Sequence, residues 1–300
     1  MAELSTPLVR FPAPAPPTRP EYVRDVVAGR DIGVVQKPLT MFLRLSNQGW
    51  LRKLLILAVI AVAWEVYARR LNNPLLVPTF TATLEAFQTG IMSGDLPRKV
   101  WTSIQLLLKG YALGLGLALV LTTLAMMFRL GNDLLETLTS AFNPLPAIAL
   151  LPLALIWFGL GDASIIFVLV HSVLWAVALN THSGFRSVSS TLRMVGRNYG
   201  LRGVPFITKI LIPAAFPSIL TGLKIGWAFA WRTLIAAELV FGVSSGKGGL
   251  GWYIFENKNT LDIPAVFAGL FTVILIGLVV ENLIFRNIEA ATVRKWGMQS

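Results

Sequence analysis

The chain has 300 residues, of which 55% are hydrophobic and 14% charged, and its mean hydropathy is +0.67. This composition is too apolar for an ordinary soluble domain and indicates an integral membrane protein. The chain has no cysteine and two histidines, which excludes disulfides and thiolate chemistry and disfavours histidine-rich metal sites.

The first half of the chain begins with a polar, proline-rich stretch that contains "FPAPAPPTRP". We expect residues 1–50 to form a cytoplasmic, mostly disordered N-terminal extension. The first predicted membrane span covers residues 51–68 and is closed by Arg69 and Arg70. A loop with several prolines follows, and within it the pattern predicts an amphipathic helix over residues 79–93.

Five further apolar runs complete an expected all-α membrane protein with six spans. The second run contains "GYALGLGLALV", whose glycines allow close helix approach in lipid. The third contains Pro144, Pro146 and Pro152, which free backbone carbonyls. We therefore expect a kinked helix that partly lines a cavity. The five runs cover residues 100–128, 134–158, 164–179, 214–237 and 264–285.

The distribution of basic residues predicts the orientation of these spans. With a cytoplasmic N-terminus, cytoplasmic segments hold 17 Lys and Arg, outer segments hold six, and three lie within spans, which accounts for all 26. This bias follows the positive-inside rule and also explains the net charge of +11 without nucleic acid. The prediction is a six-span transmembrane domain over residues 51–285, with a cytoplasmic tail at residues 286–300.

The longest predicted cytoplasmic loop, residues 180–213, ends in "MVGRNYGLRGVPFITKILIP". It resembles the loop signature of ABC importer permeases, which runs Glu-Ala-Ala, three residues, Gly, nine residues, Ile, one residue and Leu-Pro. Gly200 then stands at the glycine position, with Ile210, Ile212 and Pro213 at the positions that follow. The opening Glu-Ala-Ala falls on Met194, Val195 and Gly196, so the acidic residue is absent. Arg193 and Arg197 could instead bond the ATPase subunit that this loop contacts in the family.

The physical reading of this loop does not depend on the resemblance. A short amphipathic helix, a glycine turn and a second helix ended by Pro213 would form a rigid knob that fits a groove of a soluble ATPase. The alternative is a basic loop held by anionic lipid.

The resemblance covers residues 64–290 and is carried by "NPLLVPTFTATLEAF", "NPLPAIALLPLALIWFGLGDAS", "NTHSGFRSV", "LIAAELVFGVSSGKGGLGWYI" and "FAGLFTVILIGLVVENLIFR". These stretches are similar to the nitrate, sulfonate and taurine subgroup of the ABC permeases, which have a type I importer fold. The resemblance implies a homodimer that works with two cytoplasmic ATPase subunits and a periplasmic or lipoprotein substrate-binding protein. ATP and Mg²⁺ would then bind to the ATPase subunits, and no cofactor to this chain.

Three charged residues in the fifth span are candidates for a translocation path or gate. Lys224 and Arg232 are eight residues apart and could share a broad helix face toward an anionic substrate, although Lys224 also fits the cytoplasmic headgroup region. Glu238 lies near the outer end of the span, as a gate contact or as a structural partner of another charge. Arg232 is the strongest candidate for the path.

Other motifs have simpler explanations. "GVSSGKGGLG" has the wrong spacing for a phosphate-binding loop and is expected to be an outer loop that meets the binding protein. His171 and His182 lack partners at metal-ligand spacing, which favours packing or hydrogen bonding. An intramembrane enzyme is a further alternative. The predicted spans contain no cluster of Ser, His and Asp and no pair of metal ligands, which argues against it.

The sequence therefore predicts the transmembrane subunit of an ATP-driven importer of a small anionic solute. It would not be an enzyme itself. A secondary transporter of organic anions, without ATPase partners, is the alternative.

Overall fold

Long helices form nearly all of the described chain, residues 48–241, 248–295 and 297 of the computed structural model. These residues contain no strand, so the all-α prediction is confirmed. The chain divides into two units, residues 1–56 and 57–300, and the predicted N-terminal extension lies outside the described residues up to residue 47. The main helices are α2 (Gly49–Leu71), α3 (Phe80–Met92), α4 (Asp95–Met127), α5 (Arg129–Phe142), α6 (Leu151–Phe158), α7 (Asp162–Ser187), α8 (Ser190–Asn198), α9 (Gly203–Phe206), α10 (Ile212–Phe241), α11 (Leu250–Asn259), α12 (Ile263–Val279) and α13 (Arg286–Glu289).

Four of the described helices are long and apolar enough to cross a membrane. They cover residues 95–127, 162–187, 203–240 and 263–294. The last two continue through π-helical turns, η2 (Ile207–Leu211) in one, η3 (Val280–Phe285) and η4 (Ala290–Arg294) in the other. α2 covers the predicted first span, but every 18-residue stretch of it carries at least three charged residues. The count of six spans therefore stays a prediction.

The predicted third span is broken in the middle rather than kinked. α5 ends at Phe142, and the short helices η1 (Ala147–Leu150) and α6 follow at an angle of 89°. Pro144 and Pro146 lie in the gap, where neither can donate a backbone hydrogen bond. The Ser164 hydroxyl of α7 fixes the second half, because it lies 3.1 Å from the carbonyl oxygen of Ala154 and 2.6 Å from that of Gly159.

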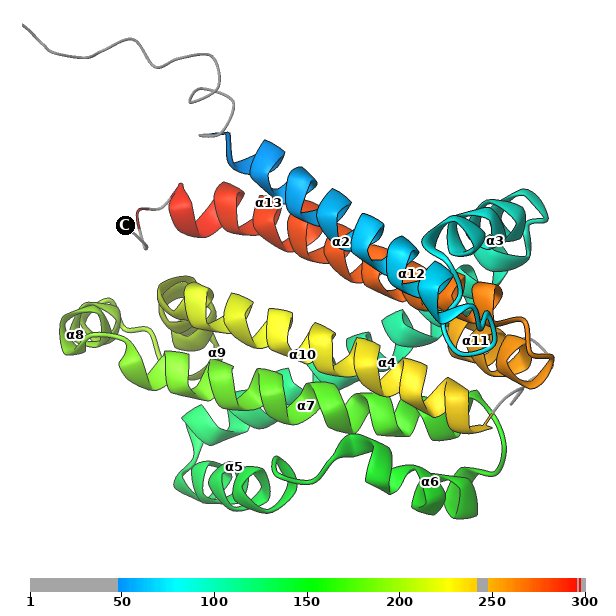
Figure 1. Ribbon diagram of the computed structural model, residues 1–300. Coiled ribbons are helices and arrows are strands. Elements are labelled where there is room, and N and C mark those ends of the chain that lie inside the picture. The colour runs from blue at the N-terminus through cyan, green and yellow to red at the C-terminus, as the bar shows by residue number, and fades with distance from the viewer. Residues whose placement is uncertain (1–47, 242–247, 296, 298–300) are drawn as a thin grey trace, which may run out of the picture. The chain divides into compact units, whose positions relative to one another are not determined.

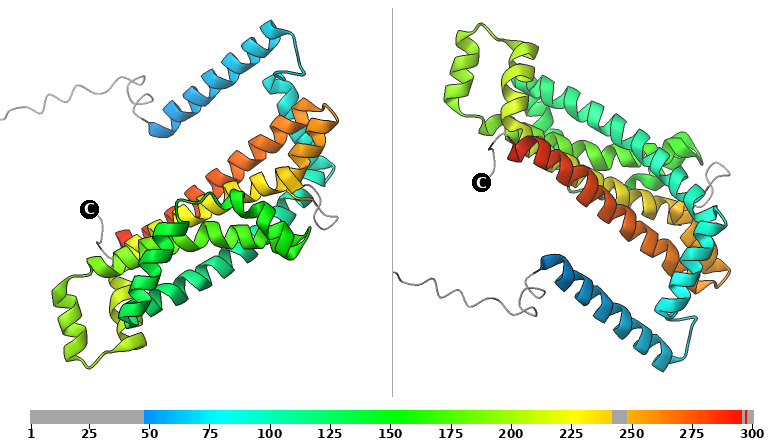
Figure 2. Two further views of the ribbon diagram at one scale, coloured as in Figure 1. Left: turned by 90° about the horizontal axis from the view of Figure 1, so that it is seen from below. Right: turned by 90° about the horizontal axis from the view of Figure 1, so that it is seen from above.

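α7 lies at the centre of the helices and packs along both α4 and α10 (Figures 1 and 2). On the α4 side, a Cβ atom at Gly110 would lie 2.5 Å from Leu169 Cβ, and one at Gly114 would lie 2.8 Å from Val173 Cβ. The two backbones approach closely because these residues lack side chains, as the sequence predicts. α8 and α9 lie at one end of the long helices, and α3 and α11 at the other (Figure 1).

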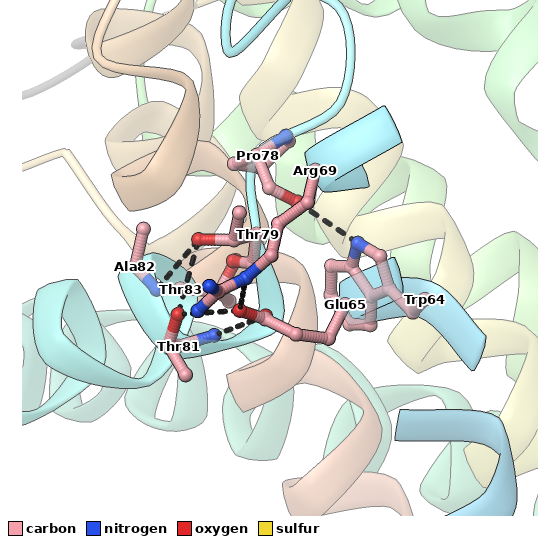
Figure 3. A network of polar contacts seen from close by, with 8 residues as sticks. All are labelled: Trp64, Glu65, Arg69, Pro78, Thr79, Thr81, Ala82 and Thr83. Atoms are coloured by element: carbon pink, nitrogen blue, oxygen red, sulfur yellow. Dashed lines mark hydrogen bonds and ion pairs between the residues drawn. The ribbon is translucent and has the colours of Figure 1, made fainter. Parts of the chain in front are cut away.

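The end of α2 is held to the start of α3 by polar contacts (Figure 3). The Glu65 carboxylate accepts hydrogen bonds from the backbone N–H of Thr81 at 3.1 Å and from its hydroxyl at 3.0 Å. The indole N–H of Trp64 donates to the Pro78 carbonyl at 2.9 Å. Thr79 caps α3 by accepting from the N–H of Ala82, which confirms the predicted helix over residues 79–93.

The close approach of α4 and α7 generates a stability prediction. Gly110→Ala should lower the thermal unfolding temperature of the purified protein. The added methyl group forces the neighbouring side chains and backbone to shift, which typically costs about 1–3 kcal/mol of stability. The matched control is Gly116→Ala in the same helix, where a new Cβ would meet no atom within 4 Å. Equal unfolding temperatures for the two variants would contradict the packing of α4 on α7.

Candidate functional site

A cavity of about 380 Å³ opens where the broken third span meets α7 and α10. The break contributes irregular backbone, and α7 contributes residues 171, 172 and 175. α10 contributes residues 229, 232, 233 and 236, which lie on one face of the helix because they are three or four positions apart. The prediction that the proline-containing span lines a cavity is confirmed. The lining residues are Asn143, Pro144, Leu145, Pro146, Ala147, Ile148, His171, Ser172, Trp175, Phe229, Arg232, Thr233 and Ala236.

His171 and Trp175 form a fixed aromatic wall of this cavity. They lie one turn apart on α7, and the Trp175 indole N–H donates to His171 Nδ1 at 3.1 Å. Phe142, at the end of α5, stacks on Trp175 with ring centroids 5.6 Å apart. Because Nδ1 accepts a hydrogen bond, a neutral His171 ring carries its proton on Nε2. The expectation that His171 serves packing and hydrogen bonding agrees with these contacts, although it also lines the cavity.

The structure separates the two basic residues of α10. The Arg232 side chain lines the cavity and has no hydrogen bond or ion pair to another described residue. Lys224 does not line it; its Nζ lies 2.6 Å from Glu289 Oε2 at the end of α13. This ion pair gives Lys224 a structural partner, and its role in a translocation path stays a prediction.

Glu238 is buried, with 3% of its surface exposed, and it connects three helices. Both carboxylate oxygens lie 2.8 Å from Ser103 Oγ of α4, and Oε2 also accepts from the backbone N–H of Gly251 at 2.7 Å. Ser103 Oγ in turn accepts from the N–H of Leu250 at 2.8 Å. The carboxylate and hydroxyl thus satisfy the first N–H groups of α11, where negative charge is favoured.

The predicted coupling residues lie at the opposite end of α10. α8 begins at the cap Ser189 and ends in a Schellman motif, in which the N–H of Leu201 bonds the carbonyl of Gly196 and the N–H of Gly200 bonds that of Arg197. Gly200 has φ of +73°, a conformation that residues with a Cβ rarely adopt. The conformation explains why the loop signature needs glycine here.

The second helix of this segment differs from the prediction. It was expected to end at Pro213, but residues 203–240 form one helix, so that prediction is wrong. π-Helical turns at residues 207–211 precede the proline, and the wider turn leaves room for a residue that cannot donate an N–H. α7 also extends to Ser187, so the connecting loop is shorter than residues 180–213.

α8 packs firmly against the start of that helix. A Cβ at Gly196 would lie 2.9 Å from both Phe206 and Ile210, so only a residue without a side chain fits this contact. Arg193 caps α7, donating to the carbonyls of Phe185 at 2.5 Å and Val188 at 3.1 Å. Arg193 is thus engaged within the chain.

The outer face of α8 is apolar and open. Exposed fractions are 57% for Met194 and 82% for Tyr199 at the helix end, and Val195 is exposed beside them. Arg197 makes no hydrogen bond or ion pair to another described residue. Ile212 packs in a separate apolar cluster with Phe185, Leu211 and their neighbours, which joins α7 to α10.

Sequence reasoning missed Ser103 and helix α11. Ser103 is one of several small polar residues in an apolar run, and nothing in its neighbourhood indicates a contact 135 residues away. α11 lies in a stretch interpreted as a loop, of which residues 242–247 lie outside the described residues. The only signal was the buried acid Glu238, whose need for donors indicated a partner without naming it.

Comparison with known families decides the identity of this arrangement. Residues 110–292 match the family of binding-protein-dependent transport system inner membrane components. The chain belongs to this family. The match covers α7, α8, α9 and α10, and with the apolar helices it supports a multi-pass inner-membrane protein of type I ABC permease fold.

Relatives support the same assignment. The permease is 32% identical over 243 residues to a putative ABC transporter permease of Methanocaldococcus jannaschii, covering 80% of this chain and 90% of the relative. It is 30% identical to the putative aliphatic sulfonates transport permease of Bacillus subtilis, covering 80% and 86%. It is 28% identical to the taurine transport system permease of Escherichia coli, covering 79% and 86%. All three names describe transport permeases and none describes an enzyme.

The Glu238 cluster generates a second stability prediction. Ser103→Ala should destabilise the permease by about 1–3 kcal/mol, because it leaves the N–H of Leu250 without its acceptor and removes a donor from Glu238. Amide hydrogen exchange at the start of α11 should become faster. The control is Thr102→Ala, whose hydroxyl bonds only its own helix at Arg98. Unchanged exchange at residues 250–251 in the Ser103 variant would contradict the proposed link.

Proposed function

We propose that this permease is the membrane subunit of an ATP-driven importer for a small anionic solute, such as nitrate, taurine, a sulfonate or a related organic acid. The carrying observation is the continuous helix from Gly203 to Val240. It joins the proposed coupling segment, residues 190–213, at one end to the Arg232 cavity near the other. A push on one end of such a helix is transmitted as a rigid-body movement to the cavity.

The coupling segment supplies the contact for an ATPase. The exposed side chains at Met194, Val195 and Tyr199 form an apolar face beside the free charge of Arg197. Gly196 holds α8 tightly on Phe206 and Ile210, so a force on this face reaches α10 rather than bending a loop. An apolar face with a basic edge suits a groove of a soluble partner better than lipid headgroups alone.

The partners follow from the family. A permease of a binding-protein-dependent system receives its solute from a substrate-binding protein, which we place on the outer side near α3 and α11. Two ATPase subunits bind ATP and Mg²⁺ on the cytoplasmic side, and two copies of this chain form a homodimer with the path between them. Both chain termini are then cytoplasmic, in agreement with the distribution of basic residues.

The solute class is supported by two relatives and by charge. Their names refer to aliphatic sulfonates and to taurine, both of which carry a sulfonate group. Arg232 offers a planar cation that binds oxyanions through two parallel hydrogen bonds.

Proteoliposomes test the proposal against the secondary transporter. The permease, its ATPase subunits and loaded binding protein should take up the solute only when ATP is present on the ATPase side. Uptake driven by an ion gradient without ATP would favour the secondary transporter and overturn the proposal.

Gly200→Val should uncouple transport from ATP hydrolysis. A β-branched residue at φ of +73° strains the Schellman motif, although space for the side chain is free. We expect the complex to assemble while ATPase stimulation by loaded binding protein falls at least about tenfold, a loss of roughly 1.4 kcal/mol in coupling. Gly200→Asn should retain more stimulation, since Asn tolerates this backbone conformation.

A matched control separates coupling from strain. Gly94 has φ of +74° and open space around it, but it lies between α3 and α4, far along the chain from the coupling segment. Gly94→Val introduces the same strain, and at a saturating concentration of loaded binding protein, which offsets any weaker docking near α3, it should leave the maximal stimulation largely intact. Normal stimulation in the Gly200→Val complex would show that α8 is not the coupling element.

A further inference from the structure

The cavity beside Arg232 has the chemistry of a ligand site in its own right. Among its lining residues there is no Asp or Glu, so nothing in the wall neutralises the guanidinium. Arg232 is exposed toward the cavity, and an unpaired charge within a membrane domain is costly unless water or a ligand compensates it. The cavity therefore has an excess of one positive charge available to an occupant.

Other donors accompany this charge. His171 Nε2 is buried and has no hydrogen-bond partner among the described residues, although the carbonyls of Phe142 and Leu145 interact with the ring. Since Nδ1 is occupied by Trp175, this nitrogen presents an N–H. A buried N–H that makes no well-formed hydrogen bond is unfavourable, and an anion in the cavity would accept one from it. The side-chain amide of Asn143 and the Thr233 hydroxyl also make no hydrogen bond to another described residue.

Apart from Ser172, whose hydroxyl donates to the Leu169 carbonyl, the rest of the wall is apolar. Trp175, Phe229, Ile148 and Ala236 surround the polar groups, and the two prolines of the break add rings without donors. A cavity of about 380 Å³ is at the lower end of the range for organic ligands, which is larger than a bare inorganic anion needs. An apolar wall next to a cluster of donors matches a molecule with an acidic head and a short apolar body.

We infer that this cavity binds a small organic anion, a sulfonate or carboxylate on a short apolar chain, with Arg232 and the His171 Nε2–H gripping the acidic head. The inference rests on the proposed function in that the occupant is the imported solute, held within the permease after it leaves the binding protein. It narrows the proposed solute to an organic anion, and it makes the permease a second point of selection that rejects nitrate and other inorganic anions, which cannot fill the apolar part.

A membrane lipid or fatty acid shares the same chemistry of acidic head and apolar body. Chain length separates the two sources. A transported solute requires only a short body, whereas a lipid gains affinity by about fourfold with each added methylene that it buries.

Direct binding tests the inference. The full-length permease with its ATPase subunits, in lipid nanodiscs without binding protein or nucleotide, is titrated with 1-butanesulfonate by calorimetry. We expect saturable binding, with nitrate and sulfate competing at least about tenfold more weakly. Arg232→Gln should weaken binding at least about tenfold and Arg232→Lys less, because Lys keeps the charge but loses the two parallel hydrogen bonds.

A second variant and a control complete the design. His171→Phe keeps an aromatic ring against Trp175 and Phe142 but removes the N–H, and it should also weaken butanesulfonate binding. Lys258→Gln removes one exposed positive charge from α11, outside the cavity, and should leave binding unchanged. Thermal unfolding of each variant shows that the fold is retained.

Each other outcome overturns the inference in a defined way. Butanesulfonate binding that Arg232→Gln and His171→Phe leave unchanged removes the cavity as the site. Equal competition by nitrate removes the role of the apolar wall. Affinity that rises steadily from butanesulfonate to dodecanesulfonate assigns the cavity to lipid.

The proposed function can fail separately. If loaded binding protein stimulates ATP hydrolysis but butanesulfonate does not bind the permease, only the cavity site is wrong. If butanesulfonate binds and ATP hydrolysis is never stimulated, the importer proposal is wrong and the anion site remains.

Discussion

Backbone hydrogen bonding in lipid is the constraint on which the arrangement of this permease depends. An N–H or carbonyl group left open in the hydrocarbon region costs several kcal/mol, so a span must either continue as a helix or break where a cavity can hydrate it. The helix over residues 203–240 takes the first course. It passes Pro213 after π-helical turns and Pro217 without ending, and it stays one mechanical element. With a rise of about 1.5 Å per residue, Arg232 lies about 28 Å beyond Pro213, close to the thickness of the hydrocarbon core.

The third span takes the second course. Pro144 and Pro146 end α5 and turn the chain through 89° before η1 begins. The irregular backbone does not face lipid alone, because it forms one wall of the cavity with α7 and α10. The same constraint thus keeps the helix over residues 203–240 continuous and breaks the third span, and both elements line the same cavity. Ser164 holds the returning half on α7, so the opening has fixed walls.

Much of this could be predicted from the sequence where the signal is local. The apolar runs predicted the long helices, Gly110 and Gly114 predicted close packing, and the spacing around Gly200 predicted a turn that the φ of +73° confirms. The prediction that the second helix of this loop ends at Pro213 was wrong. A helix can continue through a proline when the preceding turn is wide enough to leave its missing N–H without a required partner. Ser103 was missed because its partners are far away in the sequence, and a local pattern does not contain that information.

The charges of α10 show how position decides what a membrane charge does. Lys224 is paired with Glu289, and Glu238 is satisfied by Ser103 and the start of α11, so both stabilise contacts between helices. Arg232 lies between them on the same helix and has no such partner among the described residues. The fold supplies polar partners for Lys224 and Glu238. A general lack of polar groups around α10 therefore does not explain why Arg232 has no partner among the described residues. The cavity, the buried donor at His171 and the missing counter-charge together indicate that the partner of Arg232 comes from outside the chain.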